Sequence, residues 1–211
     1  MNKALVGRIW FGIIAAQVIL VIPIRMYLSW FDVTGEFEQA WARSVNVLCY
    51  FTNQSNLIVG VVCLMLAINI DRQSTRFVIA ELTGLICVIV AGTVYYLMLA
   101  SEDNLKGMEI PCNFIVHASV PIMFTIGWLV FISHGNVTWR TVRYSLAFPV
   151  GWAIFAMIRG AIISYYPYPF MDVRDLGYPT ALINMLVVTL FFVALFIGAY
   201  FVDKKLGQRT A

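Results

Sequence analysis

A threonine and a histidine in different hydrophobic segments are the residues whose chemistry stands out in this sequence. The stretch "YFTNQSNLIVG" begins at Tyr50 and carries Thr52 at the head of a polar run, and "CNFIVHASVPIMF" carries His117. A threonine hydroxyl becomes a nucleophile when a neighbouring base takes its proton, and neutral imidazole is suited to that task. The amides of Asn56 and Asn113 could stabilise a developing negative charge. Together these groups are the parts for acyl transfer.

The elements that position these residues must cross a membrane. Of the 211 residues, 61% are hydrophobic and 12% charged, and the mean hydropathy is +0.84, outside the range of water-soluble domains. A helix needs about 20 largely apolar residues to cross the hydrocarbon layer. Such segments are Arg8–Trp30, Ser44–Ile70, Phe77–Ala100, Asn113–Ser133, Thr141–Tyr165 and Tyr178–Val202. The sequence therefore predicts an all-α fold, a six-transmembrane-helix bundle that forms one domain over residues 1–211.

Lys and Arg residues gather on one side of this predicted bundle. Six spans place both termini on that side, together with the connections near residues 71–76 and 134–143. It carries Lys3, Arg8, Arg72, Arg76, Arg140, Arg143, Lys204, Lys205 and Arg209, whereas the opposite side carries Arg25, Arg43, Lys106, Arg159 and Arg174. Because positively charged connections stay in the cytoplasm, both termini are predicted to be cytoplasmic. The net charge of +3 is dispersed, which argues against nucleic acid as a partner.

The polar residues of several segments are predicted to meet in the outer half of the bundle. Thr52 falls about eight residues into the second segment, roughly 12 Å below its outer end at 1.5 Å per residue. His117 falls about four residues below Asn113 in the fourth segment, roughly 6 Å down. In a regular helix the His117 carbonyl would accept a hydrogen bond from the backbone N–H of residue 121. Pro121 has no N–H, which predicts a distortion beside the histidine.

Other interpretations of the same residues remain open. Ser, Thr and Asn hydrogen bonds often serve only to hold membrane helices together, and a single histidine is often a packed residue without a catalytic role. The side chains of Arg25 and Arg159 could simply extend to the lipid headgroups. What favours a site is that a hydroxyl, a base, amides and cations from different segments all fall in one layer.

Three stretches of the sequence resemble the androgen-induced membrane hydrolase family. They are "YFTNQSNLIVG", "NFIVHASVPIMF" and "VGWAIFAMIRGAIISYYPYPF", the last ending at Phe170. Members of this family are six-helix threonine enzymes that cleave fatty-acid esters of hydroxy fatty acids. The resemblance implies that Thr52 is the nucleophile and His117 the base, and the chain is similar to bacterial members. That similarity implies a bacterial plasma membrane as its location.

These observations lead to one hypothesis for the chemistry. Thr52 attacks the ester carbonyl of a lipid that enters from the bilayer, and His117 carries the proton. Asn56 or Asn113 donates to the oxyanion, and Arg159 holds an anionic group of the substrate. Tyr168, with the tyrosines that precede it, forms an interfacial rim.

A different class of protein fits the same residues. In a channel, transporter or small-molecule-binding membrane protein, the polar layer would be an outward-facing vestibule whose arginines coordinate an anion. No cofactor or metal is indicated, because one histidine and scattered acids fall short of a three-ligand catalytic site. The natural lipid and the oligomeric state are left open.

Overall fold

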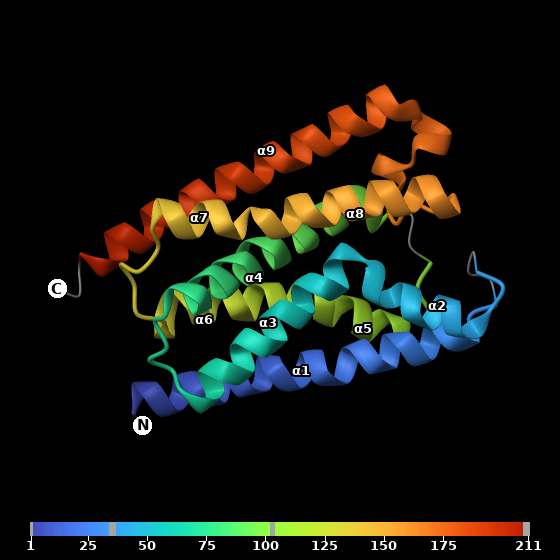
Figure 1. Ribbon diagram of the computed structural model, residues 1–211. Helices are drawn as coiled ribbons and strands as arrows, with labels where there is room; N and C mark the ends of the chain where they lie inside the picture. Colours follow the sequence, from blue (N-terminus) through green and yellow to red (C-terminus); the bar gives the residue numbers. More distant parts are fainter. Residues whose placement is uncertain (1, 34–36, 102–103, 209–211) are drawn as a thin grey trace.

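The computed structural model describes residues 2–33, 37–101 and 104–208. Within these ranges every regular element is a helix, and six helical segments are long and apolar enough to cross a membrane. They are Lys3–Phe31, Phe51–Ile68, Thr75–Leu99, Glu109–Phe131, Trp139–Ile163 and Val173–Gly207. The chain is therefore an all-α, multi-pass integral membrane protein, as its composition predicts (Figure 1).

Short irregular turns divide most of these segments into smaller elements. A 3-10 helix is tighter than an α-helix and a π-helix is wider, and both change the direction in which side chains point. In chain order the elements are α1 (Lys3–Phe31), α2 (Ala40–Asn46), the 3-10 helix η1 (Val47–Cys49), α3 (Phe51–Ile68), α4 (Thr75–Val94), the π-helix η2 (Tyr95–Leu99), α5 (Glu109–Phe114), the π-helix η3 (Ile115–Ser119), α6 (Val120–Phe131), α7 (Trp139–Ser145), α8 (Ala147–Ile163), the 3-10 helix η4 (Pro169–Met171) and α9 (Val173–Gly207).

The predicted second helix, Ser44–Ile70, is wrong at its start. A separate short helix, α2, ends at Asn46, and Tyr50 has extended backbone (φ −70°, ψ 137°) between η1 and α3. Thr52 is therefore the second residue of α3, not about eight residues inside a continuous helix. Residues before the break are apolar enough to continue a membrane segment, so hydropathy alone does not reveal it.

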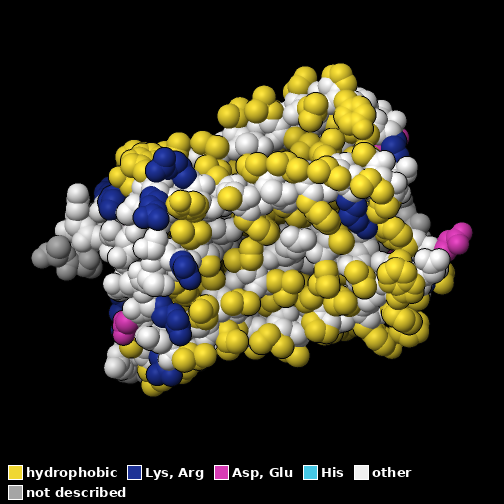
Figure 2. Space-filling model, viewed as in Figure 1, with side chains coloured by type: hydrophobic (Ala, Val, Ile, Leu, Met, Phe, Trp, Pro, Cys, Tyr) yellow, Lys and Arg dark blue, Asp and Glu magenta, His cyan; other side chains and the backbone are white. Residues whose placement is uncertain are grey.

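Both termini lie at the same end of the bundle, which we call the terminal end (Figure 1). Figure 2 shows Lys and Arg side chains gathered at this end and hydrophobic side chains along the length of the helices. Arg209, predicted to belong to this positive end, lies outside the described residues. The opposite end, which we call the far end, contains α2 and the α8–α9 connection (Figure 1).

The packed centre of the bundle consists of α1, α3, α4 and α6, and its largest fully buried side chains include Phe11, Leu66, Leu82 and Phe124. At Gly60 of α3, an added Cβ would lie 2.8 Å from the Val18 side chain of α1, so the two helices approach as closely as small residues allow.

Helices α8 and α9 lie at one side of this centre, and α9 rises away from α8 towards the far end (Figure 1). Their outward faces carry exposed apolar side chains, including those of Ile154, Ile158, Leu186 and Leu190. In a membrane these faces contact lipid.

Candidate active site

Thr52 lies in the first turn of α3, where backbone N–H groups have no partner within the helix. The first bond of the helical pattern runs from the N–H of Gln54 to the carbonyl of Tyr50, at 3.1 Å. The Thr52 side chain is only 5% exposed, yet it lines two cavities. The break at Tyr50 therefore places a hydroxyl beside the start of a helix and at the wall of a cavity.

The polar residues that follow Thr52 mainly hold the break and the helix packing together. Asn53 and Gln54 donate their amide hydrogens to the carbonyls of Val47 and Leu48, at 2.7 and 2.9 Å, which satisfies groups that η1 leaves without helical partners. The Ser55 hydroxyl donates to its own helix. Of the five polar side chains from residue 52 to residue 56, Thr52 is the one that lines the two cavities.

Asn56 fixes α3 against the turn that carries His117. Its Nδ2 donates to the carbonyl of Thr52 at 2.8 Å and to the carbonyl of Val116 at 3.1 Å. Both hydrogens of the amide are thus engaged, and Asn56 lines neither cavity. In this arrangement Asn56 positions the two helices and has no hydrogen left to donate to an oxyanion.

His117 lies in the π-helix η3, at the distortion predicted from Pro121. The wide turn ends where the N–H of Val120 bonds the carbonyl of Ile115, five residues back. At Gly92 of α4, an added Cβ would lie 2.5 Å from the carbonyl oxygen of His117, so α4 touches the histidine backbone directly. The absence of a side chain at Gly92 is what allows this approach.

The His117 ring is held by an aromatic stack and faces the cavities. Its centroid lies 4.0 Å from that of Tyr95, with an angle of 18° between the rings. The histidine is 8% exposed and lines both cavities. Its Nδ1 is buried and has no hydrogen-bond partner within residues 2–33, 37–101 and 104–208. A buried imidazole nitrogen without a partner is available to exchange a proton with a bound group.

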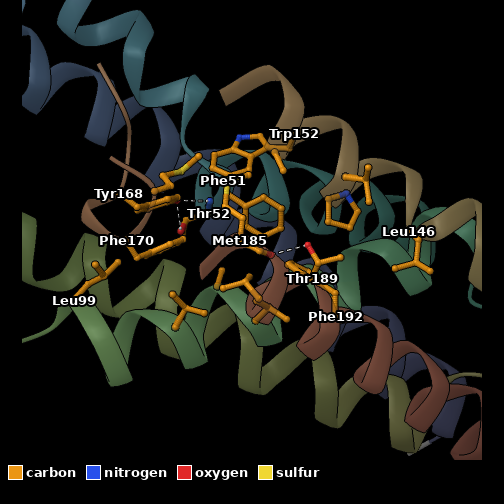
Figure 3. A pocket seen from close by; sticks show the side chains of 18 of the residues that line it. Phe51, Thr52, Leu99, Leu146, Trp152, Tyr168, Phe170, Met185, Thr189 and Phe192 are labelled. Atoms are coloured by element: carbon orange, nitrogen blue, oxygen red, sulfur yellow. Dashed lines mark hydrogen bonds between the residues drawn. The ribbon is translucent and has the colours of Figure 1, made fainter. Parts of the chain in front are cut away.

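Two cavities of opposite character meet at the same four residues. One, which we call the polar chamber, has a volume of about 500 Å³ and is lined by groups that include Arg25, Glu109 and Asn113. The other, which we call the apolar slot, has a volume of about 70 Å³ and is walled mostly by α3, α4, α8 and α9 (Figure 3). The residues that line both are Thr52, Leu99, His117 and Tyr168.

Tyr168 reaches Thr52 from the α8–α9 connection. Its hydroxyl oxygen lies 3.4 Å from the Thr52 backbone nitrogen and 3.5 Å from Thr52 Oγ1. Dashed lines mark these contacts in Figure 3. Burial raises the pKa of Tyr168 above 10.0, while hydrogen bonds from Thr52 act in the opposite direction. The phenol is therefore neutral at physiological pH and can both accept and donate a hydrogen bond.

The remaining predicted site residues divide between the chamber and its surroundings. Asn113 lines the polar chamber, as the sequence predicts. Arg159 lines neither cavity, because its guanidinium donates to Asn46 at 2.8 Å and lies over the rings of Phe37 and Tyr165. It fastens α2 to α8. The cation in the chamber wall is instead Arg25, to which the sequence assigns no definite role.

Two further groups at the site were not singled out from the sequence. Thr189 of α9 lines the apolar slot and donates its hydroxyl to the carbonyl of Met185 at 2.8 Å (Figure 3). Tyr50 lines the polar chamber and shares a short hydrogen bond with Tyr165. Burial, followed by the neighbouring Tyr165, raises the pKa of Tyr50, so its phenol stays protonated. No sequence pattern marks either residue, because only the tertiary fold brings them to the cavities.

The arrangement combines a buried hydroxyl, an imidazole whose Nδ1 has no partner in the described part of the chain, and a polar and an apolar space. The residues described contain no group of three or more His, Cys, Asp or Glu side chains that could hold a metal ion. Comparisons of the chain with protein-family models, with curated proteins and with solved structures found no match.

Proposed function

We propose that this protein is an intramembrane hydrolase of fatty-acid esters, with Thr52 as nucleophile and His117 as general base. The observation that carries the proposal is that both residues line the same two cavities, one polar and one apolar. An ester of a lipid needs such a boundary, because its acyl chain is apolar while its carbonyl and the attacking water are polar. The resemblance of three sequence stretches to the androgen-induced membrane hydrolases supports the same assignment.

The reaction proceeds in two halves that use one base. Thr52 Oγ1 bonds to the ester carbonyl carbon and passes its proton to His117, which returns it to the departing alcohol as the ester C–O bond breaks. Water then attacks the acyl-threonine and gives a proton to the same imidazole. When the bond to Thr52 breaks, that proton restores the threonine hydroxyl and the fatty acid leaves.

The walls of the two cavities indicate how a lipid ester would lie. Its acyl chain occupies the apolar slot, against the side chains of Trp152, Met185 and Phe192 (Figure 3). The alcohol part occupies the polar chamber, where Arg25 and Asn113 offer hydrogen-bond donors. Because α8 and α9 border the slot and lie at the side of the bundle, the chain enters from the bilayer between them. The resemblance favours an ester of a hydroxy fatty acid.

The same proposal includes the orientation in the membrane. The positive terminal end faces the cytoplasm, since Lys and Arg concentrate there, and the polar chamber opens towards the opposite face. The resemblance to bacterial relatives supports the bacterial plasma membrane as the location. A transport role is less well supported, because the fully buried apolar side chains of Leu66, Leu82 and Phe124 fill the centre of the bundle.

Hydrolysis of a chromogenic p-nitrophenyl acyl ester by purified variants tests the proposal. Thr52→Val, which keeps the shape of the side chain and removes the hydroxyl, is expected to abolish turnover above background. Thr52→Ser is expected to retain part of it. Ser55→Ala and Thr189→Val are matched controls that remove a nearby hydroxyl and keep Thr52. Turnover that survives Thr52→Val and disappears in Thr189→Val would assign the nucleophile to α9 and overturn the proposal.

A further inference from the structure

The Tyr168 hydroxyl occupies a position at the start of α3 that is suited to an anion. Its oxygen accepts a hydrogen bond from the backbone N–H of Thr52, with 3.4 Å between nitrogen and oxygen. The backbone of Phe51 also forms a hydrogen bond with this oxygen. Phe51 and Thr52 are the first two residues of an 18-residue helix. Their N–H groups point out of the helix end and carry the positive end of its dipole. Such an end binds negatively charged oxygen atoms.

A second observation, a buried polar atom without a partner among the described residues, points to a ligand at this helix end. His117 is 8% exposed and lines both cavities at which Thr52 and Tyr168 meet. Its buried Nδ1 has no hydrogen-bond partner in the described part of the chain. The Thr52 hydroxyl, the His117 imidazole and the N–H groups at the start of α3 therefore border a common space. The Tyr168 oxygen is the polar atom that reaches both Thr52 Oγ1 and the Thr52 N–H from outside the helix.

We propose that the N–H groups of Phe51 and Thr52 form the oxyanion site of the reaction and that the Tyr168 hydroxyl occupies this site until a substrate carbonyl oxygen displaces it. This inference rests on the proposed function and adds two roles to it. The donors are backbone groups, in place of the Asn56 and Asn113 amides. Tyr168 is the resting occupant of the site and not a donor in the transition state.

The electron balance of the first step explains why donors are needed at this point. As Thr52 Oγ1 bonds to the carbonyl carbon, the π-electron pair of the C=O bond moves onto its oxygen, and the hydroxyl proton goes to His117. The resulting oxyanion accepts hydrogen bonds from the backbone N–H groups of Phe51 and Thr52. When the pair returns to re-form C=O, the ester C–O bond breaks and the alcohol takes the proton from His117. The same oxygen becomes negative again when water attacks the acyl-threonine.

The surroundings of Tyr168 are consistent with an exchangeable occupant. The two contacts of its hydroxyl oxygen with the Thr52 nitrogen and Oγ1 are long for hydrogen bonds, at 3.4 and 3.5 Å, and therefore weak. Its ring stacks on Phe170 and meets Tyr50 edge to face, with centroids 5.4 and 6.0 Å apart. These aromatic contacts hold the ring without holding the hydroxyl. A substrate carbonyl can take the N–H groups while the ring keeps its place in the cavity wall.

Two substitutions test the two parts of the proposal through the rate at which a fluorophosphonate probe labels Thr52. Replacing Phe51 by phenyllactic acid changes one amide to an ester, which removes the N–H and keeps the aromatic ring. Loss of one oxyanion donor is expected to slow labelling by about 10²-fold. The same replacement at Phe77, in the first turn of α4 at the terminal end, is the matched control and should label at the wild-type rate.

Tyr168→Phe removes the occupant and keeps the ring, so labelling is expected to accelerate by about two- to tenfold, the effect of one weak hydrogen bond. Slower labelling of Tyr168→Phe, with an unchanged thermal midpoint, would make the hydroxyl a donor and overturn its role as occupant. An unchanged rate for phenyllactic acid at position 51 would overturn the backbone site. Wild-type protein without any adduct on Thr52 would instead overturn the proposed function itself, and this inference with it.

Discussion

Gly92→Ala is the substitution that most sharply separates the position of His117 from its chemistry. An added Cβ would lie 2.5 Å from the His117 carbonyl oxygen, whereas ordinary contacts begin at 3.4 Å, so the two backbones must part by about 0.9 Å. The carbonyl belongs to His117, the proposed base, and Pro121 has no N–H to bond it. The His117 imidazole therefore moves by a similar distance relative to Thr52.

This displacement should affect both the reaction rate and the free energy of unfolding. A misplacement of about 1 Å in a catalytic group costs about 10²-fold in rate. The overpacking itself destabilises the fold by about 1–3 kcal/mol. We therefore expect kcat for a p-nitrophenyl acyl ester to fall by about 10²-fold, with a lower thermal midpoint in detergent.

Gly198→Ala in α9 is the matched control, because no atom lies within 4 Å of the added Cβ. Alanine is favoured over glycine inside a helix by about 0.5–1 kcal/mol, so this variant should keep the wild-type kcat and unfold slightly later. If Gly92→Ala loses stability as expected but turns over at the wild-type rate, the position of His117 does not control the chemistry.

Three further substitutions test other parts of the arrangement. Asn56→Leu leaves the carbonyls of Thr52 and Val116 without their shared donor. The free energy of unfolding is expected to fall by about 1–2 kcal/mol, and turnover to fall with it. Unchanged values of both would contradict the bridging role of Asn56. Met185→Trp fills part of the apolar slot and should lower kcat/KM for a palmitoyl ester at least tenfold more than for a butyryl ester, about 1.4 kcal/mol of selective binding. An equal effect on both esters would place the acyl chain elsewhere. Hydrogen bonds from Arg174 hold the pKa of Asp172 in the folded protein below 3.8. The carboxylate therefore stabilises the α8–α9 connection above pH 3.8, and this stabilisation is lost as the pH falls through the lowered pKa. The carboxylate is buried and the guanidinium partly exposed, so Asp172→Asn should lower the free energy of unfolding at pH 7 by about 1 kcal/mol, and the difference from wild type should shrink in acid. A difference independent of pH would count against the ion pair.

The number and type of the membrane segments could be predicted from the sequence because hydropathy over about 20 residues responds directly to burial in lipid. The break at Tyr50 could not. Its cause is local, since Asn53 and Gln54 cap the carbonyls of Val47 and Leu48, and a window of that width averages over the turn. The distortion at His117 was predictable because Pro121 removes a specific N–H.

The sequence indicates candidate site residues by their type, whereas their contacts come only from the structure. Thr52, His117, Asn113 and Tyr168 line the polar chamber. For Arg159, depth along the helix says nothing of which neighbour the side chain meets, and in the structure it meets Asn46 and two aromatic rings.

Asn56 illustrates the same limit of sequence reasoning. A spacing of four residues puts Asn56 and Thr52 on one face of α3, but the amide hydrogens of Asn56 go to two backbone carbonyls. Which donors remain for a ligand depends on the complete set of contacts, and the sequence does not contain that set.

If Thr52 is the nucleophile, an acyl group passes through its side-chain oxygen during turnover. The most direct measurement is peptide mass spectrometry of protein mixed with an acyl ester and quenched in acid during turnover. We expect a peptide containing Thr52 that is heavier by the mass of the acyl group, and its absence after His117→Ala. An acyl group found on Thr189, or turnover without any acylated peptide, would rule out Thr52 as the nucleophile.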